Sequence, residues 1–565
     1  MKINLKTFKS AITIVGLLFI GIIISCKEET LIEDPSTARS FTPSGLTVRT
    51  VKDSAIFNWK LPLYGSGKAL TYTLELSKDS LFSVIDYSRV TDTTGALFTD
   101  LDIAINTPYF YRLKVNQYNE TPESRYLFPG KAMRITGQQY LRPIRDFEIG
   151  NTSVLLHWLI NSSTAGIDKA VLKSKINEQE TTVDISTAEA AAGQKLITGL
   201  LPGTSYTVQL LAGRKSKGLA SIITAAEPVF TTVLNPTDNL ATAIANAVSG
   251  DVIGLNPGTY TLSSATFIVE KSITIRSVSN NPADTKIKSR ELNPTGNGAG
   301  ITLIGLDIDG NYSGTSNGTT VFQLYGTQTT NSAAAEFGDI KIDNCVIHDY
   351  LRCIVRGNYG SAALVQKAGK FSITNSIIYN IDKTYSASSS GYYMFSLEKL
   401  QFTSITVSKS TFYQMGEGLV NMSTTLTGAP TPTISFDYCT FNAFGGNNKY
   451  LFVDANANKV NFSITNSILA NTGLWGSLNA AAQRSAAGSS LTFNNNNYFK
   501  LLVTAPNGAG LNLSTLGIAN PYSIDLGWGM NTTNFALPQS TTDPSAALFT
   551  ASTNSSTIGD PRWAY

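Results

Sequence analysis

The sequence predicts an all-β chain in which two antiparallel sandwich domains precede a parallel solenoid. Charged residues make up only 15% of the 565 residues, against about 25% in an average soluble protein, which argues against long surface helices. Residues 42–136 and 137–234 each contain short alternating segments separated by turn signals, which is typical of sandwich strands. From Ile340 onward one motif recurs every 28–34 residues, and such a period indicates a solenoid.

The first 25 residues have the pattern of an export leader. Lys2, Lys6 and Lys9 are followed by a short apolar run over residues 12–24, too short to span a bilayer comfortably. The run ends at Ile23-Ile24-Ser25-Cys26, which resembles the lipobox of bacterial lipoproteins. This resemblance implies cleavage after residue 25, acylation of Cys26 and a lipidated linker over residues 26–41. The alternative is an ordinary secretory leader that happens to contain a cysteine.

The residues after Cys26 suggest where the chain is displayed. Lys27-Glu28-Glu29 resembles the surface-export signal of Bacteroidota lipoproteins. We therefore expect a protein held in the outer membrane by its lipid anchor and facing the cell exterior. Acyl chains at about 0.8 kcal/mol per buried CH₂ would make that attachment essentially permanent.

Charge and residue counts exclude several classes of function. The net charge is +3, and the three leader lysines account for all of it, so the rest of the chain has no electrostatic footprint for nucleic acid. Two histidines argue against a histidine-based metal enzyme and a Ser-His-Asp hydrolase. Besides Cys26 the chain has Cys345, Cys353 and Cys439, an odd, widely spaced set that is no disulfide scaffold. Cys345 and Cys439 are expected to be small buried residues.

The two sandwich regions share one plan. Ser54 to Trp59 and Ser153 to Trp158 alternate toward a tryptophan, and later segments begin near Tyr109 and Tyr206. Each region resembles a fibronectin type III domain, with the tryptophan in the core and the tyrosine at the tyrosine corner. The resemblance implies a spacer that holds the next domain away from the membrane, with carbohydrate binding as the alternative.

Residues 236–565 form the solenoid. Asp238-Asn239 can cap a helix that places Leu240, Ile244 and Val248 on one face, and a Gly-Asp turn and a strand follow. This order resembles the N-terminal cap and first coil of a pectin-lyase-like right-handed parallel β-helix, whose apolar end must be covered. The tail Ile558 to Trp563 is expected to close the far end.

The repeated motif reads apolar-x-apolar-x-Asn-Ser/Cys-x-apolar. Six copies begin at Ile340, Phe371, Ile405, Ile434, Phe462 and Leu491. Asparagine at the fifth place tolerates the left-handed backbone of a tight bend. Stacked coils would then form an asparagine ladder, as the resemblance also implies, from Asn344, Asn375, Asn466 and Asn495. The small residue after it suits a crowded interior column.

In the β-helices that this region resembles, polysaccharide binds on the face formed by the second strand after the asparagine bend. Alternation puts Arg352 and Arg356 outward on one face there. The candidate glycan groove, which suits sugar hydroxyls and uronate carboxylates, comprises Arg352, Arg356, Tyr325, Tyr359, Tyr392 and Asn421. The alternative is that Arg356 pairs with Glu398 and Arg352 with Asp349.

The resemblance also suggests a possible reaction. Lyases on this fold remove the proton next to a uronate carboxylate with an Arg or Lys and usually hold Ca²⁺ with several carboxylates. Here the candidate catalytic residues are Arg352, Arg356, Glu398 and Asp454, with an arginine as base; Ca²⁺ is expected only for a lyase, and Asp382 is a further carboxylate. A glycosidase would need two carboxylates such as Glu398 and Asp454. None of the catalytic motifs of known polysaccharide lyases or polygalacturonases is present.

Taken over nearly its full length, the chain resembles uncharacterised β-helix lipoproteins of Bacteroidota glycan-utilisation systems. We expect a cell-surface lipoprotein that binds or helps to process a plant or algal polysaccharide, with uronate-containing chains among the candidates. Other surface glycan-uptake proteins are possible partners. The first alternative is a polysaccharide lyase acting by β-elimination, and the second is a structural adhesin or scaffold.

Overall fold

The computed structural model describes residues 39–357, 365–382, 391–501, 511–538 and 543–565. The described chain forms two compact units, the second of which contains residues 144–155, 196–204 and 223–565. No helix among the described residues has the length and apolar character needed to cross a membrane. The predicted leader and Cys26 lie outside the described residues.

The first sandwich is built from antiparallel strands in two sheets, ordered β1-β2-β5 and β4-β3-β6-β7. Trp59 is buried in its core, as the alternating pattern predicts, and its ring contacts Tyr72 edge-on at 5.4 Å. Tyr109 is buried as well. The strands are β1 (Ser44–Val51), β2 (Ser54–Lys60), β3 (Tyr72–Ser77), β4 (Tyr87–Thr91), β5 (Gly95–Thr99), β6 (Tyr109–Val115) and β7 (Ala132–Met133).

The second sandwich has the sheets β10-β9-β12-β13 and β11-β8. Trp158 and Tyr206 are buried, as expected, and His157 lies on strand β8. The elements are η2 (Asp146–Glu148), β8 (Ser153–His157), β9 (Lys169–Ser174), β10 (Glu180–Asp184), α2 (Thr187–Ala192), β11 (Gln194–Thr198), β12 (Ser205–Ala212) and β13 (Lys215–Ile223).

A short helix, α3 (Leu240–Asn246), begins the solenoid, as the capping pattern predicts. The side chain of Asn239 accepts a hydrogen bond from the Thr242 amide at 3.0 Å, and the buried face consists of Leu240 and Ile244. Val248 was expected on the same face, but it lies beyond the end of the helix and is exposed. The Val248 amide donates instead to Asp251 Oδ2 at 2.8 Å, which turns the chain toward the first strand.

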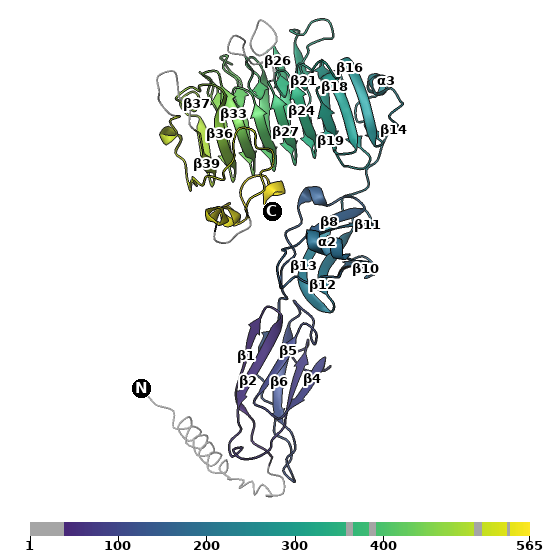
Figure 1. Ribbon diagram of the computed structural model, residues 1–565, viewed down its shortest axis with the longest axis vertical. Helices are drawn as coiled ribbons and strands as arrows, with labels where there is room; N and C mark the ends of the chain where they lie inside the picture. The colour runs from purple at the N-terminus through teal and green to yellow at the C-terminus, as the bar shows by residue number, and fades with distance from the viewer. Residues whose placement is uncertain (1–38, 358–364, 383–390, 502–510, 539–542) are drawn as a thin grey trace, which may run out of the picture. The chain divides into compact units, whose positions relative to one another are not determined.

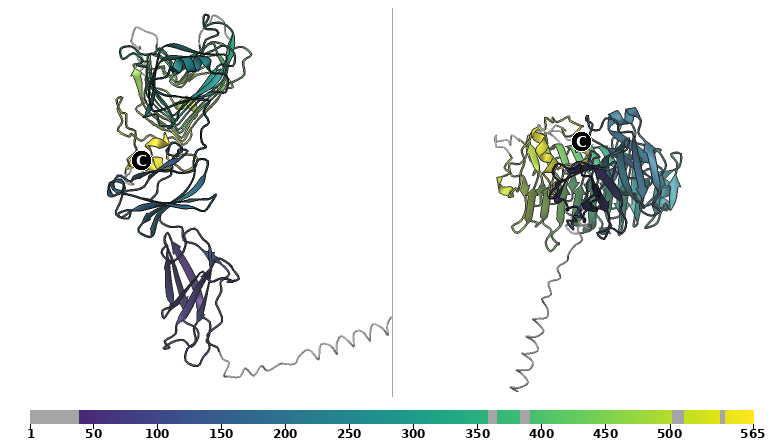
Figure 2. Two further views of the ribbon diagram at one scale, coloured as in Figure 1. Left: turned by 90° about the vertical axis from the view of Figure 1, so that its right-hand side faces the viewer. Right: turned by 90° about the horizontal axis from the view of Figure 1, so that it is seen from below.

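The solenoid is a parallel β-helix formed by two long sheets (Figures 1 and 2). The eleven-stranded sheet contains β14 (Thr232–Leu234), β15 (Val252–Leu255), β17 (Ser272–Ser277), β19 (Gly300–Ile304), β22 (Ala335–Phe337), β23 (Ile340–Asp343), β26 (Gln366–Thr374), β29 (Gln401–Ser408), β32 (Thr433–Asp437), β35 (Asn461–Thr465) and β38 (Ser490–Asn494).

The fifteen-stranded sheet has a longer and a shorter row of strands. Its longer strands are β16 (Gly258–Val269), β18 (Thr285–Thr295), β20 (Asp307–Asp309), β24 (Val346–Tyr350), β27 (Ile377–Ile381), β30 (Thr411–Met415), β33 (Thr440–Gly446), β36 (Ile468–Trp475) and β39 (Asn497–Phe499). Its two-residue strands are β21 (Phe322–Gln323), β25 (Val355–Arg356), β28 (Phe395–Ser396), β31 (Val420–Asn421), β34 (Val453–Asp454) and β37 (Gln483–Arg484).

The register of the coils agrees with the sequence repeat. Each motif start pairs with the next one along the eleven-stranded sheet: Ile340 with Phe371, Phe371 with Ile405, Ile405 with Ile434, Ile434 with Phe462, and Phe462 with Leu491. These side chains fill the single apolar core that runs through the helix. The spacing between motifs therefore equals one coil.

The bend after each of these strands has a left-handed backbone. Asn344, Asn375, Asn466 and Asn495 have φ values of 50°, 48°, 51° and 56°. Their amide groups do not donate to one another: Asn375 and Asn466 donate to the carboxylates of Asp343 and Asp437 in the preceding coil.

The residue after the bend forms a hydrogen-bonded ladder inside the helix. The Cys345 amide donates to Ser376 Oγ at 3.1 Å, and the Ser376 amide donates to Ser410 Oγ at 3.1 Å. Further along, the Cys439 amide donates to Ser467 Oγ at 3.0 Å. This inner ladder explains why the position after the bend needs a small side chain that can accept a hydrogen bond. Cys345, Cys353 and Cys439 are buried free thiols.

The tail Ile558 to Trp563 does not close the far end of the β-helix, contrary to our expectation. Leu511, Leu513, Leu516 and Ile518 pack on the last coil instead; Leu516 lies in η3 (Ser514–Leu516). The tail runs back along the outer side of the longer strands, where it includes η4 (Pro544–Thr550) and η5 (Pro561–Trp563). There Trp563 Nε1 donates to Thr411 Oγ1 at 2.6 Å. Buried apolar contacts with the longer strands therefore hold the tail in place.

Candidate functional site

The two-residue strands bring one polar side chain from each coil into a row. Their first residues belong mainly to the apolar core, as Phe322, Val355 and Val420 do, so the second residues face outward. Direct pairing places these second residues side by side. We call this set the short-strand row; it consists of Gln323, Arg356, Ser396, Asn421, Asp454 and Arg484.

Cations of this face lie on aromatic rings. The guanidinium groups of Arg352 and Arg356 are 5.3 and 5.2 Å from the centre of the Tyr392 ring. Arg484 lies 4.9 Å from the centre of the Tyr450 ring in the same way. Arginine over an aromatic ring is held in a fixed plane and can still present its N–H groups to a carboxylate.

The two carboxylates proposed as catalytic have separate partners. Asp454 receives two hydrogen bonds from Arg484, at 2.8 and 2.9 Å, as neighbours in the short-strand row. Glu398 lies just beyond the row and accepts a hydrogen bond from Asn421 at 2.8 Å. Pairing of β34 with β37 thus gives Asp454 the partner Arg484, and the sequence analysis did not consider the strand β37.

The tyrosines of the predicted groove are placed differently from one another. Tyr325 accepts a hydrogen bond from Gln323 at 2.6 Å, and its ring meets Phe267 edge-on, so it lies at the N-terminal end of the row. Tyr392 carries the two arginines described above. Tyr359 lies outside the described residues.

The sequence argument missed Glu291, a buried carboxyl at the same end of the row. Its oxygens receive hydrogen bonds from Asn293 Nδ2 at 3.2 Å and from Thr319. Burial raises the pKa of Glu291, although Asn293 and the charges of nearby arginines, including Arg352 and Arg356, oppose the shift. Leu292 pairs with Phe322, so extending the row one coil toward the N-terminus reaches Asn293, and Glu291 is the neighbouring position on the same face of strand β18.

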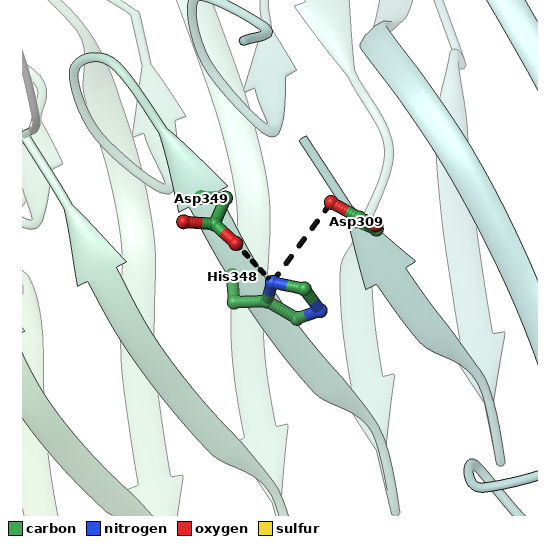
Figure 3. Close-up of side chains that lie close together, drawn as sticks. All are labelled: Asp309, His348 and Asp349. Atoms are coloured by element: carbon green, nitrogen blue, oxygen red, sulfur yellow. Dashed lines mark hydrogen bonds and ion pairs between the residues drawn. The ribbon is translucent and has the colours of Figure 1, made fainter. Parts of the chain in front are cut away.

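A second polar cluster lies on the longer strands and is built around His348 (Figure 3). His348 Nδ1 lies 2.7 Å from Asp349 Oδ2 and 3.9 Å from Asp309 Oδ1, while Nε2 lies 3.0 Å from Asp307 Oδ1. Lys286 Nζ is 2.9 Å from Asp307. Burial lowers the pKa of His348, but the hydrogen bonds with Asp307 and Asp349 outweigh it and raise the value above 6.5.

An aromatic stack extends from this histidine. The His348 and Tyr379 rings lie 4.9 Å apart and nearly parallel, and Tyr379 stacks on Tyr413 at 4.8 Å. Asp309, His348, Tyr379 and Tyr413 occupy one position in successive coils. Comparing the residue after the buried aliphatic or aromatic one in each coil would have revealed this column from the sequence.

Metal-ligand spacing occurs at this cluster rather than on the short-strand row. Among the described residues, the only group of three His, Cys, Asp or Glu side chains close enough to share an ion is Asp309, His348 and Asp349. Imidazole and carboxylate donors suit a divalent transition ion. In the structure His348 Nδ1 and the carboxylate oxygens of Asp309 and Asp349 are engaged with one another.

The remaining candidate carboxylate, Asp382, is buried inside the helix. Burial raises its pKa to about 9, a hydrogen bond from the Tyr392 amide opposes the shift and the nearby Glu417 adds to it. Asp382 accepts from the Tyr392 amide, whereas Glu398 accepts from Asn421 and Asp454 from Arg484. The three carboxylates considered for Ca²⁺ have separate surroundings.

Comparison with known proteins gives no activity for this chain. A family model named DUF4957, a domain of unknown function, matches residues 258–415, from the start of β16 to the end of β30. This segment includes Glu291, His348, Arg352 and Arg356. No curated protein matches the chain.

Solved structures similar to part of the chain are fibronectin type III segments. The FN1–FN3 domains of chicken CNTN1 are 12% identical, with 33% of this chain and 68% of that chain covered and a TM-score of 0.14. The central fibronectin-III array of RIM-binding protein is 20% identical, with 34% and 71% covered and a TM-score of 0.13. A two-domain segment of chicken tenascin is 16% identical, with 33% and 99% covered and a TM-score of 0.16. With scores this low, the fold assignment of the sandwiches rests on their own sheets.

Proposed function

We propose that this chain is a surface lipoprotein that binds an acidic polysaccharide along the short-strand row. The observation that carries the proposal is the row itself, in which the half-exposed Arg356, Asn421 and Arg484 alternate with the buried Gln323, Ser396 and Asp454 over six successive coils. Adjacent strands lie about 4.8 Å apart, so a linear polymer lying across them meets a regular series of hydrogen-bonding groups.

The arginines favour an acidic polymer over a neutral one. Arg352 and Arg356 share the Tyr392 ring, which fixes two cations close together on one face. Guanidinium groups bind carboxylates through two parallel hydrogen bonds, as Arg484 already does with Asp454. A uronate carboxylate can occupy the corresponding position on Arg352 or Arg356.

The binding proposal is tested by affinity electrophoresis of the mature chain with Cys26→Ser. The gels contain pectin, alginate or a glycosaminoglycan, and we expect retardation by at least one acidic glycan. Arg356→Ala is expected to reduce the retardation strongly. Lys341→Ala, which removes an exposed cation from the eleven-stranded sheet, serves as the matched control and should leave it unchanged. Equal retardation of both variants would contradict the assignment of the row.

A polysaccharide lyase on the same face is the second candidate, and Glu291 favours it. A carboxyl whose pKa is raised by burial is suited to proton transfer, and the charges of Arg290, Arg352 and Arg356 act on Glu291. β-Elimination would create a conjugated double bond, so the same glycans are monitored by ultraviolet absorbance. A rise that is lost in Glu291→Gln or Arg352→Ala would make the protein a lyase. If neither gel retardation nor a rise in absorbance is observed, a structural scaffold is favoured.

The cellular location is part of the proposal and rests on the leader. Acylation at Cys26 would attach the chain to the outer membrane, with the sandwiches between the anchor and the β-helix in sequence. Labelling of growing cells with a radioactive fatty acid tests this step. The wild-type chain should carry the label and Cys26→Ser should not.

A further inference from the structure

Several loops of the first sandwich meet at the end where the chain enters the domain. Ser44 at the start of β1 pairs with Lys60 at the end of β2, and Tyr72 pairs with Val115, so residues 39–43, 61–71 and 116–122 gather at one end. The Ser40 amide donates to the Pro122 carbonyl at 3.0 Å across this group. The end is defined here as the entry tip. It surrounds a groove of about 550 Å³.

The entry tip exposes large apolar side chains together. Phe41 is 53% exposed, Leu61 47%, Leu63 63% and Tyr64 73%. The Phe41 and Tyr64 rings contact each other edge-on at 5.6 Å, which makes a continuous aromatic surface. Such a grouping of exposed apolar residues marks an interaction surface, whereas scattered single ones do not.

The charge around these residues is mainly positive. Arg39 and Lys68 are exposed at the tip and Lys60 immediately beside it, while the exposed acids are Glu120 at the tip and Glu123 immediately beside it. Tyrosine and phenylalanine flanked by Lys and Arg are typical of segments at a lipid–water interface.

The opposite end of the same sandwich differs in charge, although it also carries exposed apolar residues. Leu81, Val84 and Ile85 are 82%, 66% and 44% exposed. There Lys78 is ion-paired with Asp86 at 3.3 Å, and Asp79 lies in the same loop. The opposite end thus lacks the surplus of cations found at the entry tip.

The chain length points to one occupant of the entry tip. Twelve residues separate Cys26 from Arg39, and the thirteen residue-to-residue steps, fully extended, reach at most about 45 Å. A lipid attached at Cys26 would therefore keep the entry tip within reach of the bilayer. We propose that the entry tip docks on the anionic lipid surface to which the chain is anchored, inserting Leu63, Tyr64 and Phe41 at the headgroup level.

This docking rests on the membrane-anchor part of the proposed function, and it supplies a second attachment beside the acyl chains. The acyl anchor would keep the chain at the membrane, and the second contact would hold the first sandwich in a defined orientation, which a flexible tether alone does not. Docking of the tip would point the opposite end of the sandwich, from which the chain continues toward the solenoid, away from the lipid.

The test measures binding of the mature chain with Cys26→Ser to sedimented vesicles of phosphatidylcholine and phosphatidylglycerol. Because this chain carries no lipid, a failure of acylation cannot affect the result, and glycan binding is measured separately. We expect the wild-type tip to bind, with binding reduced by salt. The triple variant Phe41→Ser, Leu63→Ser, Tyr64→Ser should lose at least tenfold in partition coefficient.

The matched control is Leu81→Ser, Val84→Ser, Ile85→Ser at the opposite end, which should bind vesicles as the wild type does. Thermal unfolding of all three chains checks that the first sandwich is folded. A further variant, Lys60→Gln with Lys68→Gln, should weaken vesicle binding while leaving the apolar side chains unchanged. The proposal is overturned if the wild type does not bind, or if the control loses as much as the tip variant. It is also overturned if sedimentation shows a dimer that only the tip variant abolishes, since the tip would then bind a second copy.

Discussion

The buried carboxyl of Asp382 makes the stability of the β-helix depend on pH in an unusual direction. Asp382 is fully buried; Oδ2 accepts a hydrogen bond from the Tyr392 amide at 3.2 Å, and Oδ1 has no hydrogen-bond partner in the structure. Glu417 and the Cys353 thiol are the titratable groups that interact with it. Replacing Asp382 with Asn removes the titration and keeps the shape of the side chain.

The magnitude follows from the pKa of about 9, raised from 3.8 mainly by burial. Between these values the unfolded chain is ionised at this position while the folded chain keeps its proton. The unfolded state is therefore favoured by about 1.4 kcal/mol for each pH unit, and stability falls as pH rises from about 4 to about 9. From about pH 5.5 to about pH 7.5 this single group costs about 2–3 kcal/mol.

The assay is differential scanning calorimetry of the mature chain at both pH values. The unfolding midpoint of the β-helix should fall by a few degrees in the wild type as pH rises, and the fall should be largely absent in Asp382→Asn. Glu336→Gln, which alters an exposed carboxylate of the same domain, should keep the wild-type slope. An Asp382→Asn chain with the wild-type pH slope would refute the reasoning.

Three further outcomes are expected. Ser410→Ala should lower the free energy of unfolding by about 1–3 kcal/mol, because the Ser376 amide loses its buried acceptor. Ser404→Ala, on the outer side of the preceding strand β29, is the control, and urea unfolding measures both. His348 should titrate above 6.5 by NMR, so its stabilisation is complete below that pH and is lost as pH rises through its folded value; with only two histidines, His157→Gln assigns the signals. Leu548→Ala should cost about 2–5 kcal/mol and speed proteolysis of the C-terminal tail, since Leu548 is fully buried against the longer strands.

The coil register could be predicted from sequence because it depends on a local pattern. An alternation of two apolar residues followed by a bend fixes one strand, and the next copy must bury the same face. Pairing of Ile340 with Phe371 and of Phe462 with Leu491 follows directly from the motif. The left-handed φ at Asn344 is likewise a property of the residue and its neighbours.

The site was less predictable because its contacts depend on loops of different lengths. Ser396, not Glu398, stands beside Arg356 in the row. Asp454 finds its partner in Arg484, one coil further on than the sequence argument reached. The position of the tail also depends on long-range packing of Trp528 and Phe535, which no repeat announces.

The His348 cluster was not predicted, because the small number of histidines was taken only as an argument against a histidine-based metal enzyme. Two histidines in the chain gave no reason to expect a polar centre, yet Asp307, Asp309 and His348 meet because the paired strands β20 and β24 bring them together. An inspection of outward positions coil by coil, rather than of known motifs, finds this cluster and Glu291 alike.

The most direct test of the central claim is hydrogen–deuterium exchange of the unlipidated chain with and without an acidic oligosaccharide that retards it. If the polymer lies along the short-strand row, amides in and beside β25, β28 and β31 should be protected, and Arg352→Ala with Arg356→Ala should remove that protection. Protection confined to the sandwiches, or to the eleven-stranded sheet, would contradict the account.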